Sequence, residues 1–377
     1  MRAFDAIHHP DFTDFSPSGR AQDRAGFRQG ILDLYAAFPD FDGQIDDLVL
    51  EPERGRAAIR WSAAGTHRGA FLGVAPGGRR IRFAGIEIIE IRDGQVIARW
   101  GEWDGLDILA QLDPARSGLE HGIFAREHPA RDALGTLLFL HGLGSWGRCF
   151  DPVVGHPGLA RFRKLLPDLP GCGLSPHQAE PLSFVDMADA LAAWLRARGE
   201  ERAIVVGHSL GGVLGTLLAE RSPDLVLGLV DVEGNIAEED CSLSAEVAAQ
   251  PLEGFLAGGF AGLLDGIYRA GLEDEILRDY YTSLRLCDPS AYFAYSVELV
   301  ALSAGGELAS RLAALDLPVA YLAGSPRGAG RRSREMLEKA GIACKVIEPA
   351  GHVPFAEQPD LFVQVLSSIA AQWCDAR

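Results

Sequence analysis

The chain has 377 residues, of which 47% are hydrophobic and 23% charged, and its formal net charge is −17. This length favours two domains over one. A surface with so many negative charges repels nucleic acid and anionic lipid, and we therefore expect neither nucleic acid nor a membrane as a partner. No apolar run approaches the ~18 residues of a membrane span, and the first residues do not have the pattern of a secretory signal. The six cysteines lack C-x-x-C spacing, which predicts reduced thiols and no metal site. We therefore expect a cytoplasmic protein.

The first 112 residues combine one helical stretch with several strand-like runs. Alternating apolar residues on either side of Asp93-Gly94 predict a β-hairpin, because Asp-Gly suits a two-residue turn. The order of helix and strands predicts an α+β domain with one or two helices and a curved antiparallel sheet. The expected elements are the helix Arg24–Phe38 and the strands Leu48–Leu50, Ala57–Trp61, Ile81–Ile91 and Val96–Trp100.

Several short motifs in this region resemble the SnoaL-like polyketide cyclase family. They are Ala37-Phe38-Pro39-Asp40, Gly65-Thr66-His67-Arg68-Gly69, Gly85-Ile86-Glu87-Ile88 and the turn Arg92-Asp93-Gly94 that leads to Trp100 and Asp104. The resemblance implies a cone-shaped domain in which an acidic residue after the last strand, here Asp104, acts as acid and base in an aldol cyclisation. The chain departs from the family at Pro76-Gly77-Gly78-Arg79 and at Phe15, where the family has a histidine. Two roles therefore stay open, catalysis by Asp104 or a ligand-binding and assembly module that forms a homo-oligomer.

Residues 113–130 contain two prolines and several polar residues, which is typical of a linker that leads into the first strand of the next domain. We place the domain boundary there, with one domain over 1–114 and another over 115–377.

The second domain alternates strands with helices, which predicts a mostly parallel sheet with right-handed crossovers. In the helix Ser183–Arg198, Ser183 and Asp186 suit the N-cap and N3 positions. Active sites in such sheets lie at the carboxyl ends of the strands. The remaining expected elements are the strands Thr136–Leu140, Lys164–Pro167, Ala203–His208 and Leu225–Val232 and the helix Val213–Arg221.

A G-x-S-x-G motif places Ser209 between Gly207 and Gly211, at the point where a strand turns sharply into a helix. A side chain at either glycine would crowd the backbone, and the turn would hold the Ser209 hydroxyl clear of the sheet. With three other motifs in the same order, this region resembles the α/β-hydrolase family. The four motifs are His141-Gly142-Leu143-Gly144, Asp168-Leu169-Pro170-Gly171-Cys172-Gly173-Leu174-Ser175, Gly207-His208-Ser209-Leu210-Gly211-Gly212 and Gly351-His352-Val353-Pro354.

The resemblance implies a catalytic triad with Ser209 as nucleophile and His352 as its base. The family's usual position for the acid, after the strand Pro318–Leu322, holds no carboxylate in this chain. Some members carry the acid one strand earlier, where Glu233 lies at the strand end and Asp231 two residues before it. We expect Glu233 to be the acid and keep Asp231 as the alternative.

The resemblance also implies an oxyanion hole formed by the backbone N–H groups of Leu143 and Leu210. Residues 236–310 contain helical segments and many aromatic side chains, which predict a helical lid over a pocket for a hydrophobic small molecule. No phosphate-binding loop or dinucleotide fingerprint occurs, so no cofactor is implied. The expected lid helices are Leu243–Ala249, Gly254–Ala270, Glu273–Leu286 and Ala291–Leu302.

The sequence thus predicts a serine hydrolase that cleaves an ester, thioester or lactone through an acyl-Ser209 intermediate, with a role in polyketide or aromatic secondary metabolism. Three alternatives stay open. The chain could combine an Asp104 aldol cyclase with the hydrolase, it could use the same triad for C–C bond hydrolysis or acyl transfer, or it could be a non-catalytic binding and assembly protein.

Overall fold

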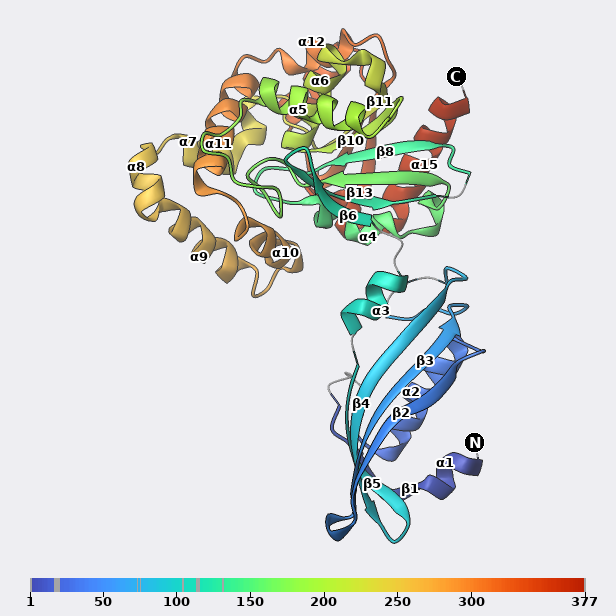
Figure 1. Cartoon of the computed structure of the whole chain (residues 1–377). Helices are drawn as coiled ribbons and strands as arrows, with labels where there is room; N and C mark the ends of the chain where they lie inside the picture. The colour runs from blue at the N-terminus through green and yellow to red at the C-terminus, as the bar shows by residue number, and fades with distance from the viewer. Residues whose placement is uncertain are drawn as a thin grey trace. The chain divides into compact units, whose positions relative to one another are not determined.

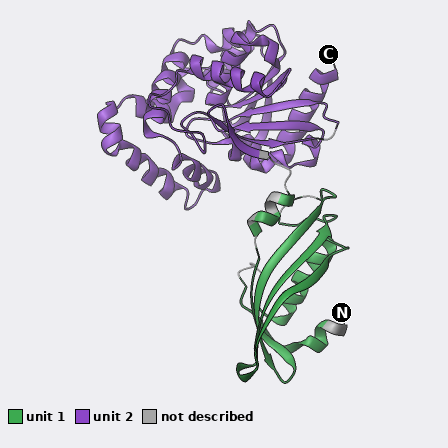
Figure 2. Ribbon diagram, viewed as in Figure 1, with its two compact units in different colours: residues 1–114 green, residues 115–377 purple. Residues whose placement is uncertain are grey.

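The computed structural model describes residues 2–16, 21–72, 74, 76–103, 105–112, 116–130 and 132–375. The chain divides into two units, residues 1–114 and 115–377, each with its own sheet and core (Figure 2). No single helix in these described ranges is long and apolar enough to cross a membrane, and one bent pair, Glu238–Ala248 with Leu252–Ala270, meets the requirement only when its two parts are taken together.

Unit 1 is a five-stranded sheet with the strand order β1-β5-β4-β3-β2 (Figure 1). Its core lies where Phe38, at the end of α2, packs on Ile81 and Phe83 of β4. The strands are β1 (His8–Asp14), β2 (Asp42–Glu51), β3 (Arg56–Thr66), β4 (Arg80–Arg92) and β5 (Gln95–Trp103), and the helices are α1 (Arg2–Ile7), α2 (Arg24–Ala37) and α3 (Gly105–Leu112).

The turn between β4 and β5 confirms the predicted hairpin. Asp93 and Gly94 have φ values of 50° and 77°, and Arg92 pairs with Gln95 across the turn. Positive φ at both central residues is the conformation for which Asp-Gly is suited. The four expected strands do form an antiparallel sheet, and a fifth strand that was not predicted, β1, adds to the edge of β5 in parallel. That pairing joins residues far apart in the chain, so no local pattern announces it.

An ion-pair network lies on the inner side of unit 1. Arg99 on β5 donates from Nε and Nη2 to both carboxylate oxygens of Glu87 on β4, each at 2.9 Å. Its Nη1 donates to Asp14 on β1 at 3.0 Å and to the Ser16 hydroxyl at 2.8 Å. Arg99 therefore connects β1, β4 and the segment after β1 through one partly buried side chain.

Unit 2 is an eight-stranded sheet with the order β13-β12-β11-β10-β8-β9-β7-β6. The six strands from β13 to β9 are parallel, and β7 pairs antiparallel with both β9 and β6. The strands are β6 (Arg116–Glu120), β7 (Ile123–His128), β8 (Gly135–Leu140), β9 (Phe162–Pro167), β10 (Ala203–His208), β11 (Val226–Val232), β12 (Val319–Arg327) and β13 (Cys344–Gly351).

The predicted linker over 113–130 is corrected by this topology, since most of it forms the hairpin β6–β7. Its turn residues His121 and Gly122 have φ values of 50° and 78°. His-Gly is a weaker turn signal than Asn-Gly or Asp-Gly, which explains why the hairpin was not predicted from the sequence. Ile123 and Ala125, two residues apart on β7, are both buried and face the core.

Helices cover both faces of the sheet in unit 2. Leu191 of α5 and Leu214 of α6 pack in one core with Val205 of β10, and Leu366 of α15 packs in the core of the opposite face. The hydroxyl of Ser183 accepts a hydrogen bond from the N–H of Asp186 and caps α5, as predicted. The helices outside the lid are α4 (Asp151–Val154), α5 (Phe184–Ala197), α6 (Leu210–Arg221), α13 (Arg331–Lys339), α14 (Pro354–Glu357) and α15 (Pro359–Asp375).

The segment between β11 and β12 is helical, and α8, α9 and α10 project beyond the sheet (Figure 1). A π-helical turn over Phe255–Gly259 interrupts the expected helix Gly254–Ala270 where two glycines follow one another. We call this segment the lid. Its helices are α7 (Ser242–Ala248), α8 (Leu252–Gly254), α9 (Phe260–Ala270), α10 (Glu275–Leu284), α11 (Pro289–Ala304) and α12 (Leu308–Ala313).

Candidate active site

Ser209 lies at the junction of β10 and α6 in a left-handed conformation, with φ 53° and ψ −121°. A Cβ on Gly207 would lie 2.3 Å from the carbonyl oxygen of Gly211, and a Cβ on Gly211 would lie 2.1 Å from that of Leu140. Real Cβ contacts are never so short, so both positions require glycine. The predicted crowding at the two glycines is therefore confirmed, and the turn presents the Ser209 side chain at the carboxyl end of β10.

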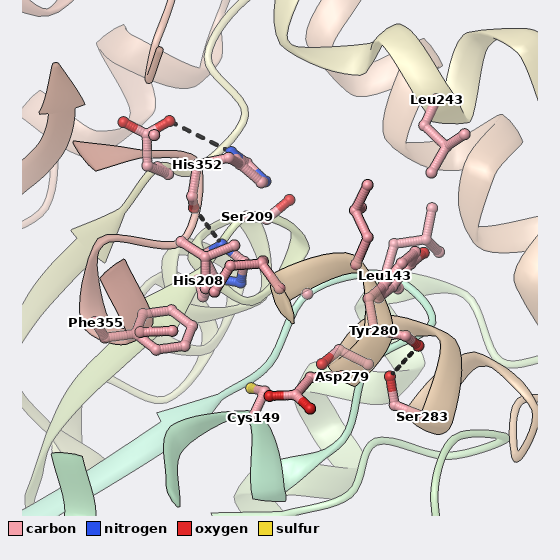
Figure 3. Close-up of a pocket in the computed structure, with 18 of the residues that line it drawn as sticks. Leu143, Cys149, His208, Ser209, Leu243, Asp279, Tyr280, Ser283, His352 and Phe355 are labelled. Carbon is pink, nitrogen blue, oxygen red and sulfur yellow. Dashed lines mark hydrogen bonds and ion pairs between the residues drawn. The ribbon is translucent and has the colours of Figure 1, made fainter. Parts of the chain in front are cut away.

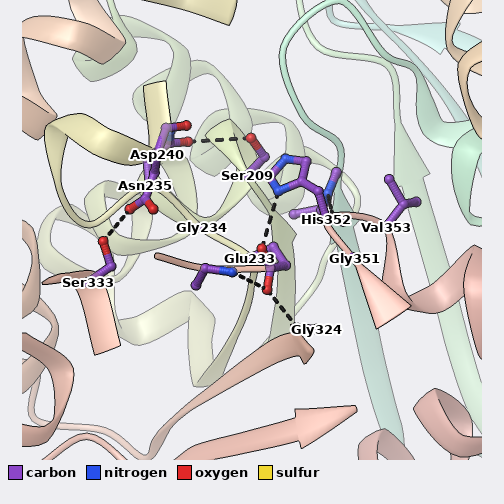
Figure 4. Close-up of polar contacts among 12 residues, drawn as sticks. Ser209, Glu233, Gly234, Asn235, Asp240, Gly324, Ser333, Gly351, His352 and Val353 are labelled. Carbon is purple, nitrogen blue, oxygen red and sulfur yellow. Dashed lines mark hydrogen bonds and ion pairs between the residues drawn. The ribbon is translucent and has the colours of Figure 1, made fainter. Parts of the chain in front are cut away.

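Glu233 follows β11 directly and is 3% exposed, with a positive φ of 52°. One carboxylate oxygen, Oε2, lies 3.3 Å from Nδ1 of His352 (Figure 4). The other, Oε1, accepts hydrogen bonds from the N–H groups of Gly324 at 2.7 Å and Ala329 at 3.0 Å. Gly324 near the end of β12 and Ala329 just after it belong to a stretch without a carboxylate of its own, and they supply the amides that hold the carboxylate of Glu233.

Asp231 points away from this pair. A Cβ on Gly212 of α6 would lie 2.1 Å from Asp231 Oδ1, which places that carboxyl behind the first turn of α6. Burial raises the pKa of Asp231 well above its ordinary value, and the nearby Glu233 raises it further. Among the described residues, no hydrogen bond or ion pair joins Asp231 to His352. The structure therefore brings Glu233, and not Asp231, to the histidine.

In Figure 4 the His352 ring lies between Ser209 and Glu233. The hydroxyl of Ser209 donates a long hydrogen bond, 3.4 Å, to Oδ1 of Asn235, and none joins it to His352 in the described part of the chain. Asn235 is itself fixed, because its Nδ2 donates to the carbonyl oxygen of Asp240 at 3.0 Å. The sequence did not predict this role for Asn235, whose only signal is its position two residues after Glu233.

His208 and His141 flank the site as structural groups. Burial lowers the pKa of His208 to about 3, and its Nε2 donates to the carbonyl oxygen of His352 at 2.8 Å. His141 accepts from the N–H of Leu169 at 2.9 Å and donates to the carbonyl oxygen of Gly142 at 2.8 Å, and burial lowers its pKa as well. Both rings are therefore neutral supports. His208 and His352 both line the pocket, and the His352 side chain is 50% exposed whereas His208 is buried.

The two predicted oxyanion donors come from different elements. Leu210 is the first residue of α6, where N–H groups have no acceptor within the helix and favour negative charge. Leu143 belongs to the loop after β8 and lines the pocket. A Cβ on Gly142 would lie 3.2 Å from the Cβ of Ser209, so this loop lies directly against the candidate nucleophile.

Leu143, Ser209, Glu233 and His352 line one cavity of about 1140 Å³ (Figure 3). Tyr280 is the one lid aromatic among the described lining residues. Most of the others pack within the lid, as Phe255 does against Tyr292 and Phe293. The apolar lid residues that line the cavity are Leu243, Ile267, Ile276, Leu277 and Leu299, and its acidic lining residues besides Glu233 are Asp151, Glu239, Asp240, Asp274, Asp279 and Glu357.

Asp104, the candidate acid of unit 1, lies outside the described residues. Within the described ranges, no group of three or more His, Cys, Asp or Glu side chains is arranged to hold a metal ion.

Comparison with known families agrees with this architecture. The model of the alpha/beta hydrolase family matches residues 137–365. The chain belongs to the alpha/beta hydrolase family. The model of the SnoaL-like polyketide cyclase family matches residues 1–112, so this hydrolase carries a SnoaL-like domain before the hydrolase domain.

The matches to two curated relatives span nearly the whole length of each relative. The pimeloyl-(acyl-carrier protein) methyl ester esterase of Aeromonas hydrophila is 30% identical over 253 residues, which are 61% of this chain and 93% of the relative. The 2-succinyl-6-hydroxy-2,4-cyclohexadiene-1-carboxylate synthase of Pectobacterium atrosepticum is 27% identical over 254 residues, 65% of this chain and 95% of the relative. A crystal structure of the N-acyl homoserine lactonase AidH with N-butanoyl homoserine has a TM-score of 0.54 at 23% identity, covering 69% of this chain and 97% of the lactonase.

Proposed function

We propose that unit 2 is a serine hydrolase that cleaves the ester, thioester or lactone bond of a hydrophobic small molecule. One observation carries the proposal: Ser209, held at a φ of 53°, lines the same cavity as a histidine that contacts a buried carboxylate. The match to an ester hydrolase over 93% of that relative's length supports the same chemistry.

In the proposed reaction, His352 takes the proton of the Ser209 hydroxyl as the oxygen attacks the substrate carbonyl. The N–H groups of Leu143 and Leu210 stabilise the resulting oxyanion, and His352 then protonates the leaving group. Water releases the acyl group from Ser209 by the same steps. Glu233 keeps the proton on Nδ1 of His352 in the resting enzyme and stabilises the imidazolium that forms.

The lining of the cavity supports a substrate with an apolar body. Leu243 of α7 and Ile276 and Leu277 of α10 offer hydrocarbon surface from two lid helices, whereas several carboxylates at the walls disfavour an anionic substrate. A volume of about 1140 Å³ accommodates a molecule larger than a short-chain ester.

Intact mass after incubation with a fluorophosphonate tests the proposal. The wild type should gain one adduct, and the Ser209→Ala variant should gain none, because the probe bonds only to an activated serine. Hydrolysis of p-nitrophenyl esters by the same two proteins should follow the labelling. A folded wild type that is not labelled would overturn the proposal and favour a non-catalytic binding protein.

A second candidate uses the same groups for C–C bond hydrolysis or acyl transfer. It is favoured by the match to a synthase over 95% of that relative's length. Product analysis of wild-type reactions with and without an alcohol acceptor separates the two, since transfer would yield a new ester where hydrolysis yields only an acid.

For unit 1 we propose binding or assembly, with the protein working in the cytoplasm on polyketide or aromatic metabolites. Support comes from an apolar stripe on the outer face of its sheet, where Val49 of β2, Ile88 of β4 and Trp100 of β5 are exposed in one cross-strand row. Ala58 of β3 lies in the same row, between Val49 and Ile88. Such a stripe suits contact with a second copy of the chain. Light scattering of wild type and Ile88→Lys tests this, since a monomeric wild type would overturn it. An aldol cyclase at Asp104 is the alternative, which Asp104→Asn with product analysis would reveal.

A further inference from the structure

A lid tyrosine is bonded to the oxyanion loop. The hydroxyl of Tyr280 on α10 donates to the carbonyl oxygen of Leu143 at 3.1 Å, and in Figure 3 the two residues lie on the same side of the pocket. The carbonyl can only accept, so the phenolic proton of Tyr280 is committed to this bond. The hydroxyl of Tyr292 on α11 lies 3.1 Å from that of Tyr280 and completes the network as its donor.

The same tyrosines leave no space around the loop. Gly144 has a φ of 66°, and a Cβ there would lie 2.6 Å from Tyr292 Cε2, 2.8 Å from Leu284 Cδ1 and 2.9 Å from Tyr280 Oη. Two lid helices are thus packed directly onto the residue after Leu143. Burial raises the pKa of Tyr280 far above its ordinary value, so its hydroxyl keeps the proton over the whole working range of pH.

The bond reaches the candidate oxyanion donor through one residue. The carbonyl of Leu143 and its N–H flank the same Cα, so fixing the carbonyl limits the rotation of the N–H. On the other side of the loop, His141 donates to the carbonyl oxygen of Gly142, which belongs to the same peptide plane as the Leu143 N–H. His141 therefore fixes the peptide between Gly142 and Leu143, and Tyr280 of the lid fixes the next peptide, between Leu143 and Gly144.

We propose that Tyr280 is a positioning residue which couples the docked lid to the oxyanion hole by holding the carbonyl of Leu143. The hydroxyl is not aimed at substrate, and its effect on the reaction passes through the Leu143 backbone. The inference rests on the proposed serine hydrolase function, because it assigns the purpose of the bond to the oxyanion donor of that reaction.

The test is Tyr280→Phe with Tyr295→Phe as the matched control. Tyr295 is also a buried lid tyrosine, and its hydroxyl donates to the carbonyl oxygen of Pro170 at 2.9 Å, in a loop that supplies no oxyanion donor. Both variants lose one buried hydroxyl-to-carbonyl bond between lid and body. Tyr280→Phe also removes the acceptor of the Tyr292 hydroxyl, so it should lose somewhat more thermal stability than Tyr295→Phe. Tyr295→Phe therefore controls for the loss of a lid-to-body bond and for a general weakening of lid packing.

Two readouts are compared, the kinetics of p-nitrophenyl esters of increasing chain length and the rate of labelling by a fluorophosphonate. Removing an oxyanion donor outright costs on the order of 10²–10³ in rate, and a donor that is present but loosely held should cost about tenfold. We expect Tyr280→Phe to lower kcat and the labelling rate by this same factor at every chain length, with KM little changed. Tyr295→Phe should leave both rates within about threefold of wild type.

An unchanged kcat in Tyr280→Phe, or an equal loss in Tyr295→Phe, would overturn the positioning role. A loss that appears in KM and varies with chain length would also overturn it, because Tyr280 would then contact the substrate directly. These results all require a wild type that reacts with the fluorophosphonate. A folded wild type without labelling or turnover is a different result, which overturns the proposed function and this inference with it.

Discussion

Replacing Glu233 by glutamine is the sharpest perturbation of the candidate triad. Oε1 of Glu233 accepts from two backbone N–H groups, of Gly324 and Ala329, so the amide of a glutamine would keep its oxygen there. Its NH₂ group would then face Nδ1 of His352, 3.3 Å away, where an oxygen accepts now. That contact favours the tautomer with the proton on Nε2, which cannot take a proton from Ser209.

The size of the effect follows from the lost charge. At 3.3 Å, a carboxylate stabilises an imidazolium by about 5 kcal/mol at an effective dielectric constant of about 20. Half of the His352 side chain is exposed, and screening at a dielectric constant of about 40 would halve this to about 2.5 kcal/mol. Since about 1.4 kcal/mol is tenfold in rate, Glu233→Gln should lower kcat by a factor between about 60 and about 5 × 10³.

The assay is steady-state hydrolysis of a p-nitrophenyl ester, with Asp231→Asn as the matched control on the same strand. Asp231 is buried behind α6, away from His352, and burial raises its pKa, which disfavours the carboxylate form, so an amide should lower kcat by no more than about threefold. Full activity in Glu233→Gln together with loss in Asp231→Asn would refute the assignment of the acid. Circular dichroism of both variants separates lost chemistry from lost folding.

Three further predictions concern the turn before Ser209, the buried His208 and the ion-pair network of unit 1. A Cβ at Gly207 would lie 2.3 Å from the backbone oxygen of Gly211. Gly207→Ala should therefore lower the free energy of unfolding in urea by about 1–3 kcal/mol and abolish fluorophosphonate labelling. Normal labelling would contradict the geometry assigned to this turn. Below pH ~6.5 the unfolded chain protonates His208, whereas the folded chain, in which His208 has a pKa of about 3, does not. The free energy of unfolding should therefore fall on acidification by up to ~1.4 kcal/mol per pH unit. A pH slope that is unchanged in His208→Asn would contradict this. Arg99→Met would remove the guanidinium that bonds to Glu87 and Asp14 and should destabilise unit 1 by about 3 kcal/mol without changing the labelling of Ser209. Unchanged melting would show that the network contributes little.

Features with strong local causes were predictable from the sequence. The Asp93-Gly94 turn and the Ser183 cap depend on neighbouring residues, and both occur as expected. The parallel pairing of β1 with β5 and the hairpin β6–β7 were missed. The first depends on contacts between distant segments, and the second turns at His121-Gly122, which carries a weak signal.

The candidate site shows the same division. The glycines around Ser209 follow from the geometry of one tight turn, so the sequence predicts them well. The choice between Glu233 and Asp231 depends on which direction each side chain takes from β11, and the sequence left it open. Tyr280 reaches the site only because the lid folds back over the sheet, and Asn235 lies there because it follows Glu233 at the end of β11. Neither residue belongs to a motif that predicts such a contact.

Ser209 and Glu233 share left-handed backbone angles, with φ values of 53° and 52°. Side chains other than glycine and asparagine hold such angles at a cost of about 1–3 kcal/mol each. In evolutionary terms, a lineage released from selection for turnover would drift toward glycine or asparagine at both positions and become more stable as it lost activity. The Ser209→Gly protein should accordingly be harder to unfold than the wild type, so in this fold inactivity and robustness would arise from the same substitution.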